Sequence, residues 1–472
     1  MFSLEICTYK SCRFEKNINL NKFISFQPKI IKRYGYEAES HEVVTEDGYI
    51  LTVHRIPSRT PETSKLPILL QHGLLDSSAG WIINGPNRSL AYQMADKGYD
   101  VWLGNARGNV YSKGHVSLSP SDQRFWNFSW HEMGYYDLPA VIDYLLNVTR
   151  SSSLYYVGHS MGTTMSYVLS STRPEYNLKI KHLFSLAPVA FMSRATSPLR
   201  YLAPYAKNLE LVTKWFGPGE FLPRNTLMNY ILKYSCENSI FESKLCEHYI
   251  FIICGYDPQQ FNMKLLPVIL GHSPAGASTK TLVHFAQLIQ SGEFAQFDYG
   301  EEENLKIYGT KEPPKYDFKK MSLPVTLYYG QNDLLANVKD VDLLYNILPN
   351  PKGMFRVNFS LFNHLDFLWS IDVNTLLNEN IETIIDKGIS DAFPLFTNAF
   401  SENKVFTLNV DRNNEHRMQK SKENFFYNFF GNDNNLESET KNTEYSLWNE
   451  FKEEVVMWKD SITDKLEVVK FW

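Results

Sequence analysis

One five-residue turn constrains this chain more than any other feature. Residues 158–162 read GHSMG, a G-x-S-x-G pattern that follows an apolar run at residues 154–157 and precedes a helical pattern. A glycine on each side of the serine permits a turn too tight for a Cβ atom, and the helix start behind it favours negative charge near the hydroxyl. The pattern predicts a nucleophile elbow with Ser160 as a catalytic serine; the alternative is a glycine-rich turn that happens to contain serine.

Short apolar runs alternate with helical patterns on both sides of this turn. Residues 41–56 predict a hairpin, and further strands and helices are expected at residues 67–71, 89–97, 99–103, 136–147, 154–157 and 180–187. The alternation stops at Pro188 and resumes at Pro324, with elements expected at residues 325–329, 338–348 and 354–359 and a helix beginning near Leu365. Such alternation indicates a parallel sheet covered on both faces. The predicted class is therefore α/β, an α/β-hydrolase fold with a mainly parallel sheet.

The same pattern divides the chain into five parts. We expect an unpatterned N-terminal extension (1–29), two parts of the hydrolase core (30–187 and 309–388), a helical cap or lid insertion between them (188–308), and an acidic tail (389–472). The insertion is too long for a loop. The tail is rich in Asn, Glu and Lys and is predicted to be mostly disordered. The exception is its end, where apolar side chains recur at helical spacing over residues 448–469 and predict an amphipathic helix.

Charge and composition exclude several classes of function. The formal net charge of −5 gives no electrostatic basis for binding nucleic acid. No apolar run is long enough to span a membrane. Histidines and cysteines do not cluster at the spacing of a zinc site, so we predict neither a metal nor a cofactor.

The signals for a cellular compartment disagree with one another. Residues 1–22 lack the continuous apolar core and cleavage site of a secretory signal. Four glycosylation sequons are nevertheless present, at Asn87, Asn127, Asn147 and Asn358. Cys236 and Cys246 could form one bridge in an oxidising compartment, whereas Cys254 is expected to be a buried free thiol. We expect a secretory-pathway protein whose true start precedes Met1; a cytoplasmic protein is the alternative.

A serine nucleophile needs a base to take its proton and an acid to orient that base. In this fold they follow along the chain in the order serine, acid, histidine. Only His364 and His416 lie beyond the strand at residues 325–329, and His416 falls in the charged tail, so His364 is the predicted base. Asp333 comes directly after that strand, where a catalytic carboxylate belongs; an ordinary helix cap is the alternative. Three other aspartates fit less well by position: Asp340, Asp342 and Asp366.

Two backbone N–H groups should stabilise the oxyanion. One is that of Met161, directly after the serine, and the other is expected in the loop after His72, most simply at Leu74. His72 and His159 themselves are interpreted as structural. A second GHS sequence, at residues 271–273, is followed by Pro274, which has no N–H to donate. Ser273 is therefore not expected to be the nucleophile.

Longer phrases around these residues carry a family resemblance. They are YGYEAE at 34–39, TEDGYIL at 45–51, QHGLL at 71–75, GYDVWLGN at 98–105, YYVGHS at 155–160, FIICG at 251–255, PAG at 274–276, NDLLA at 332–336 and NHLDF at 363–367. Over about residues 30–388 the chain resembles the acid lipase family of animals, the family of gastric lipase and lysosomal acid lipase.

This resemblance implies a secreted or lysosomal serine lipase that hydrolyses triacylglycerols or cholesteryl esters at a lipid–water interface, often at acidic pH. It implies a triad of Ser160, Asp333 and His364, and oxyanion donors at Leu74 and Met161. It further implies a movable lid within the cap, a Cys236–Cys246 disulfide and an unpaired Cys254. Three features depart from the family: methionine replaces the usual glutamine at position 161, the secretory signal is missing, and the tail has no counterpart.

Two other functions stay open on the sequence alone. The first is a soluble carboxylesterase for short-chain esters, which would use the same triad. The second is a non-catalytic lipid-binding protein on a hydrolase scaffold, which predicts a defective triad. Epoxide hydrolase and dehalogenase chemistry is disfavoured, because those enzymes use an aspartate at the elbow.

Overall fold

The computed structural model describes residues 27–58, 65–201, 203–204, 219–222, 250–392 and 406–407. The chain divides into two units after Leu408, and every described residue lies in the first. Cys236, Cys246 and the predicted amphipathic helix at residues 448–469 lie outside the described residues.

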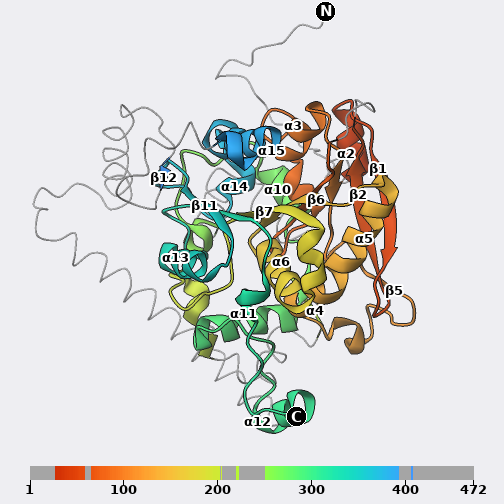
Figure 1. Ribbon diagram of the computed structural model, residues 1–472, viewed down its shortest axis with the longest axis vertical. Coiled ribbons are helices and arrows are strands. Elements are labelled where there is room, and N and C mark those ends of the chain that lie inside the picture. The colour runs from red at the N-terminus through yellow and green to blue at the C-terminus, as the bar shows by residue number, and fades with distance from the viewer. Residues whose placement is uncertain are drawn as a thin grey trace, which may run out of the picture. The chain divides into compact units, whose positions relative to one another are not determined.

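A ten-stranded sheet organises the described residues. Its order is β1 (Glu39–Val44), β2 (Tyr49–Ile56), β4 (Val101–Leu103), β3 (Ile68–Gln71), β6 (Leu154–His159), β7 (Ile180–Leu186), β10 (Val325–Tyr329), β11 (Pro351–Arg356) and β12 (Phe406–Thr407), with β5 (Gly114–His115) beside β2. Figure 1 shows β1 and β2 at one edge and β11 and β12 at the other. Strand β2 pairs antiparallel with its neighbours, and every pair from β4 to β12 is parallel. The predicted α/β fold with a mainly parallel sheet is confirmed.

The central strands are buried at all or all but one of their residues, which explains their continuous apolar sequences. Every residue of β3 and β10 is buried, and β6 and β7 each leave one residue at least partly exposed. A sheet buried on both faces needs helices on both. Helix α6 packs on β6, α13 on β10, and α3 on β2 and β4. These strands therefore form a buried scaffold, and the loops that carry the predicted site residues follow their ends.

Helices lie at four places where the sequence predicts them, residues 89–97, 136–147, 338–348 and directly after Ser160, and at others that it does not predict. Their bounds are α2 (Gln27–Arg33), α3 (Leu90–Asp96), α4 (Trp130–Glu132), α5 (Leu138–Thr149), α6 (Met161–Thr172), α10 (Leu266–His272), α11 (Thr279–Ser291), α12 (Glu301–Tyr308), α13 (Val338–Ile347), α14 (Asp366–Trp369) and α15 (Glu379–Ala392). Short turns are η1 (Ser78–Trp81), η2 (Gln123–Trp126), η4 (Pro174–Leu178), η5 (Pro198–Tyr201) and η7 (Phe318–Lys320), and the π-helical segments are η3 (Met133–Asp137) and η8 (Asn374–Asn378). Among the described residues, no helix has the length and apolar character that crossing a bilayer requires.

The segment between β7 and β10 contributes no strand to the main sheet within its described residues. It contains η5, α10, α11 and α12, together with β8 (Glu220–Phe221) and β9 (Ala277–Ser278), which pair antiparallel with each other. Figure 1 places α12 at the far end from α3 and α15.

Two regions differ from the sequence-based expectation. The helix expected from near Leu365 is three segments, α14, η8 and α15, because the Asn84 side chain donates to the carbonyl oxygens of Leu368 and Ser370 (3.2 and 3.0 Å) and ends the first segment. Beyond residue 388, α15 continues to Ala392 and β12 extends the sheet beside β11. The three apolar residues of the stretch VFTL at residues 405–408 are not apparent when composition is averaged over the polar tail.

Candidate active site

The turn from β6 to α6 holds Ser160 in a strained backbone conformation. Ser160 has φ 52° and ψ −117°, a positive φ that few non-glycine residues adopt. Its two flanking glycines are required by close backbone approaches. A Cβ atom at Gly158 would lie 2.8 Å from the carbonyl carbon of Gly162, and one at Gly162 would lie 2.4 Å from the carbonyl oxygen of Gln71. The serine is thus placed at the start of α6 by packing that excludes larger residues.

A glycine-to-alanine pair tests this packing. We expect Gly162→Ala to lower the free energy of unfolding by about 3 kcal/mol, because the new methyl group must displace the backbone of β3. Gly271→Ala is the control: nothing lies within 4 Å of a Cβ there, and the residue is helical, so we expect stability unchanged or raised by up to about 1 kcal/mol. Urea unfolding of both variants measures the difference. Equal effects at the two positions would contradict the packing argument.

Three residues from distant parts of the chain form one hydrogen-bonded row. His364 Nε2 lies 2.8 Å from Ser160 Oγ, and His364 Nδ1 lies 2.8 Å from Asp333 Oδ2. The second carboxylate oxygen of Asp333 accepts the N–H groups of Leu335 and Ala336, both at 2.8 Å. With Asp333 an acceptor, Nδ1 carries the histidine proton and Nε2 is free to accept the serine proton. The structure therefore brings together the predicted serine, histidine and aspartate.

The other candidate acids are engaged elsewhere. Asp340 is buried and pairs with Arg194, whose Nη1 lies 2.8 Å from its Oδ1. Asp366 accepts the N–H of Asn363 at 2.7 Å. Neither bonds to the imidazole of His364, in agreement with their lower rank in the sequence.

Two backbone N–H groups beside Ser160 have no acceptor among the described residues. They belong to Leu74 and Met161. The loop that carries Leu74 lies against the elbow, because a Cβ atom at Gly73 would lie 3.0 Å from Ser160 Cβ. Met161 is the first residue of α6, so its N–H is unpaired and points out of the helix start. Both predicted donors are therefore adjacent to the serine.

His72 fixes the orientation of one of these donors. Its Nδ1–H donates to the carbonyl oxygen of Gly73 (2.7 Å), while its Nε2 accepts the N–H of Ala106 (3.0 Å). The Gly73 carbonyl and the Leu74 N–H belong to one planar peptide group and point in opposite directions. Burial lowers the pKa of His72 to about 4, so the ring stays neutral and keeps this bond. Its position next to a glycine was the only sequence signal for this role.

His159 makes a hydrogen bond to the backbone of His364. Its Nε2–H donates to the carbonyl oxygen of His364 at 2.9 Å, and the two ring centroids are 5.1 Å apart. Burial lowers the pKa of His159 to about 3, which keeps the ring uncharged beside the site. A bond to a residue 205 positions away left no mark in the local sequence.

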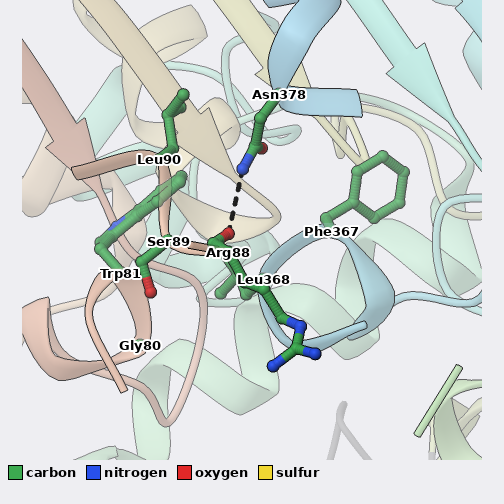
Figure 2. A pocket seen from close by; sticks show the side chains of 8 residues that line it. All are labelled: Gly80, Trp81, Arg88, Ser89, Leu90, Phe367, Leu368 and Asn378. Atoms are coloured by element: carbon green, nitrogen blue, oxygen red, sulfur yellow. Dashed lines mark hydrogen bonds between the residues drawn. The ribbon is translucent and has the colours of Figure 1, made fainter. Parts of the chain in front are cut away.

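The helix after His364 is anchored to the segment between β3 and α3. Figure 2 shows a small pocket that Phe367 and Leu368 of α14 line together with Trp81, and in which the Asn378 side chain donates to the Arg88 carbonyl (3.0 Å). The Trp369 indole also donates to the carbonyl oxygen of Gly80 at 3.2 Å. The histidine turn is thereby held on its C-terminal side.

Ser273 has a different role from Ser160. Its hydroxyl donates to the carbonyl oxygen of Leu75 (3.1 Å), which also accepts the N–H of Ala275 (2.6 Å). The second GHS sequence therefore braces the loop that carries Leu74.

In the part of the chain that the structure describes, no group of three or more His, Cys, Asp or Glu side chains could hold a metal ion.

Comparisons with known proteins identify lipases and the α/β-hydrolase fold. A family model described as "Partial alpha/beta-hydrolase lipase region" matches residues 27–85, and one described as "alpha/beta hydrolase fold" matches residues 67–232. The chain is 43% identical to Lipase 1 of Drosophila melanogaster over 372 residues, covering 79% of this chain and 82% of the relative. It is 39% identical to human gastric triacylglycerol lipase over 378 residues, covering 79% and 92%. With human lipase member K it shares 38% identity over 385 residues, covering 80% and 93%.

Proposed function

This chain belongs to the acid lipase family of animals, and we propose that it is a serine lipase that hydrolyses the ester bonds of neutral lipids such as triacylglycerols and cholesteryl esters. The observation that carries the proposal is the hydrogen-bonded row from Ser160 Oγ through His364 to Asp333. Relatives that cover most of the chain are named lipases, one of them for triacylglycerol. That similarity supports a lipid ester as the substrate class.

The first half of the reaction forms an acyl-serine. His364 Nε2 accepts the Ser160 proton as Oγ attacks the ester carbonyl carbon, and the negative charge that forms on the carbonyl oxygen is stabilised by the Leu74 and Met161 N–H groups. Asp333 stabilises the imidazolium. When the tetrahedral intermediate collapses, the C–O bond to the alcohol breaks and His364 gives that oxygen its proton.

The second half releases the fatty acid. Water loses a proton to His364 Nε2 and attacks the acyl carbon, and the same two N–H groups receive the charge. The bond to Ser160 Oγ then breaks, and the proton returns from His364 to the serine. The described residues that carry out both halves belong to the core and need no added cofactor.

We further propose that residues 188–308 form a cap that covers the cleft in water and opens at a lipid surface. Its β8 strand is tied to the core, since Lys113 Nζ lies 2.5 Å from Glu220 Oε1. A secreted or lysosomal location would fit the four sequons, of which Asn87, Asn127 and Asn147 are exposed and Asn358 is half-buried. A bridge between Cys236 and Cys246 belongs to the same proposal.

Esters of increasing acyl length test the substrate class. We expect the specificity constant to rise up to about fourfold per added methylene while the acyl chain fills an apolar site. We also expect activity on a long-chain ester to rise sharply once its concentration passes the solubility limit and an emulsion forms. Hydrolysis is followed by titrating the released acid.

The same assay separates the two rivals. A preference for short acyl chains, with no response to an emulsion, would favour a soluble carboxylesterase. Binding of a long-chain ester without hydrolysis at any pH would favour a lipid-binding protein. Either result would contradict the lipase proposal.

A further inference from the structure

Two buried carboxyl groups lie together beneath the turn that carries His364. Asp366 follows that histidine by two residues and is 2% exposed; Asp257 comes from the segment after Cys254 and is fully buried. The two side chains lie close enough to act as hydrogen-bond partners of each other. Because an ionised carboxylate can only accept hydrogen bonds, a bond between them requires a proton on one of the two.

The other hydrogen bonds of the pair leave one carboxyl oxygen without a donor. Asp366 Oδ2 accepts the N–H of Asn363 at 2.7 Å. Asp257 Oδ1 accepts the N–H groups of Gln259 and Gln260 at 3.0 and 3.1 Å, while its Oδ2 meets no N–H or other donor among the described residues. The neighbouring carboxyl of Asp366, when protonated, is a donor that can satisfy this oxygen.

Uncharged and acidic groups surround the pair. On its own turn lies His364, and the facing segments contribute Asp333 and Cys254. His159 lies against His364, and Asp372 lies against Gln260. Burial raises the pKa of Asp257 to about 6, and burial together with the neighbouring carboxylates holds the pKa of Asp366 well above its usual range. The surroundings therefore favour retention of the shared proton.

The pair joins two segments that also hold the histidine. The Asn363 side chain donates to the carbonyl oxygen of Gly255 (3.0 Å), and the His364 N–H donates to that of Cys254 (3.3 Å). Gly255 has φ +117°, and a Cβ atom there would lie 2.9 Å from Asn363 Cβ. The segment at residues 254–257 and the turn at residues 363–366 therefore pack as one unit, so repulsion within the pair would act on the position of His364.

We propose that Asp257 and Asp366 are positioning residues that hold the His364 turn by sharing one proton, so that hydrolysis is lost on the alkaline side when that proton leaves. The proposal rests on the proposed hydrolase function. The proposal also predicts how the stability of the fold changes with pH. Free carboxyls lose their protons near pH 4, whereas the folded pair keeps one to higher pH, so the folded state loses stability as the pH rises through this interval.

The variants Asp257→Asn and Asp366→Asn test the proposal. An amide can donate the hydrogen bond without a dissociable proton, and its oxygen can still accept the backbone N–H groups. On a water-soluble ester we expect the alkaline half-maximum of kcat/KM to move up by about one pH unit or more, with acid-side values within about threefold of wild type. Asp340→Asn is the matched control, because that buried aspartate pairs with Arg194 and should leave the alkaline limit unchanged.

Thermal unfolding from pH 4 to 8 provides a second measurement that needs no activity. From pH 4 to 8, the unfolding temperature of the wild type should fall by more than that of either amide variant. If wild type hydrolyses no ester, the proposed function fails while this comparison still tests the pair. An alkaline limit that is the same in wild type and both amide variants would overturn the proposal, and so would a change in unfolding that leaves the alkaline limit of an active enzyme in place.

Discussion

Ser160→Ala should lower kcat for ester hydrolysis by about 10⁴- to 10⁶-fold without unfolding the protein. The hydroxyl is the atom 2.8 Å from His364 Nε2, so its removal leaves the base with no nucleophile to activate. The fold should survive, because alanine keeps the Cβ atom and Oγ makes no cap bond to α6. Initial rates on one soluble ester and on one emulsion measure the effect, and circular dichroism verifies the fold.

Ser273→Ala is the control for this substitution. It lies in the second GHS sequence, and its hydroxyl bonds to the Leu75 carbonyl, which keeps a second donor in the Ala275 N–H. We expect it to retain most activity. Wild-type rates in Ser160→Ala, or a loss in Ser273→Ala as large as that in Ser160→Ala, would show that the nucleophile has been assigned to the wrong residue.

The strands were the most predictable part of the fold. The expected strand at residues 325–329 has the bounds of β10, because a short apolar run bordered by Pro324 and Gly330 has few other solutions. The helix after Leu365 was less predictable. What divides it is the side chain of Asn84, nearly 300 positions away, and no local periodicity contains that information.

The site shows the same division between local and distant information. Ser160, Asp333 and His364 could be selected because chain order and strand ends restrict where each can lie. The bond that His159 makes, and the role that we propose for Asp257 and Asp366, could not be predicted, because each depends on a partner that only the fold brings near. Residues that perform the chemistry can be recognised by motifs in the sequence. Residues that position them are recognised only in the structure, as buried polar side chains.

Asp333→Asn should lower kcat by about 10⁴-fold, although the substitution is nearly isosteric. Asp333 Oδ1 is fixed by the N–H groups of Leu335 and Ala336, so the amide oxygen will occupy that place. The NH₂ group must then face His364 Nδ1, now 2.8 Å from Oδ2. A donor there requires Nδ1 to be the acceptor, which moves the histidine proton to Nε2.

A histidine with its proton on Nε2 cannot accept the proton of Ser160, so the loss should appear in kcat on soluble and emulsified esters alike. Asp342→Asn is the control, because that residue lies in α13 and takes no part in the row; we expect its activity to stay near that of wild type. The ring proton of His364 can be located by nitrogen NMR in both variants. Full activity in Asp333→Asn would mean that the acid partner is another residue, whereas low activity with the proton still on Nδ1 would mean that charge rather than tautomer is what Asp333 supplies.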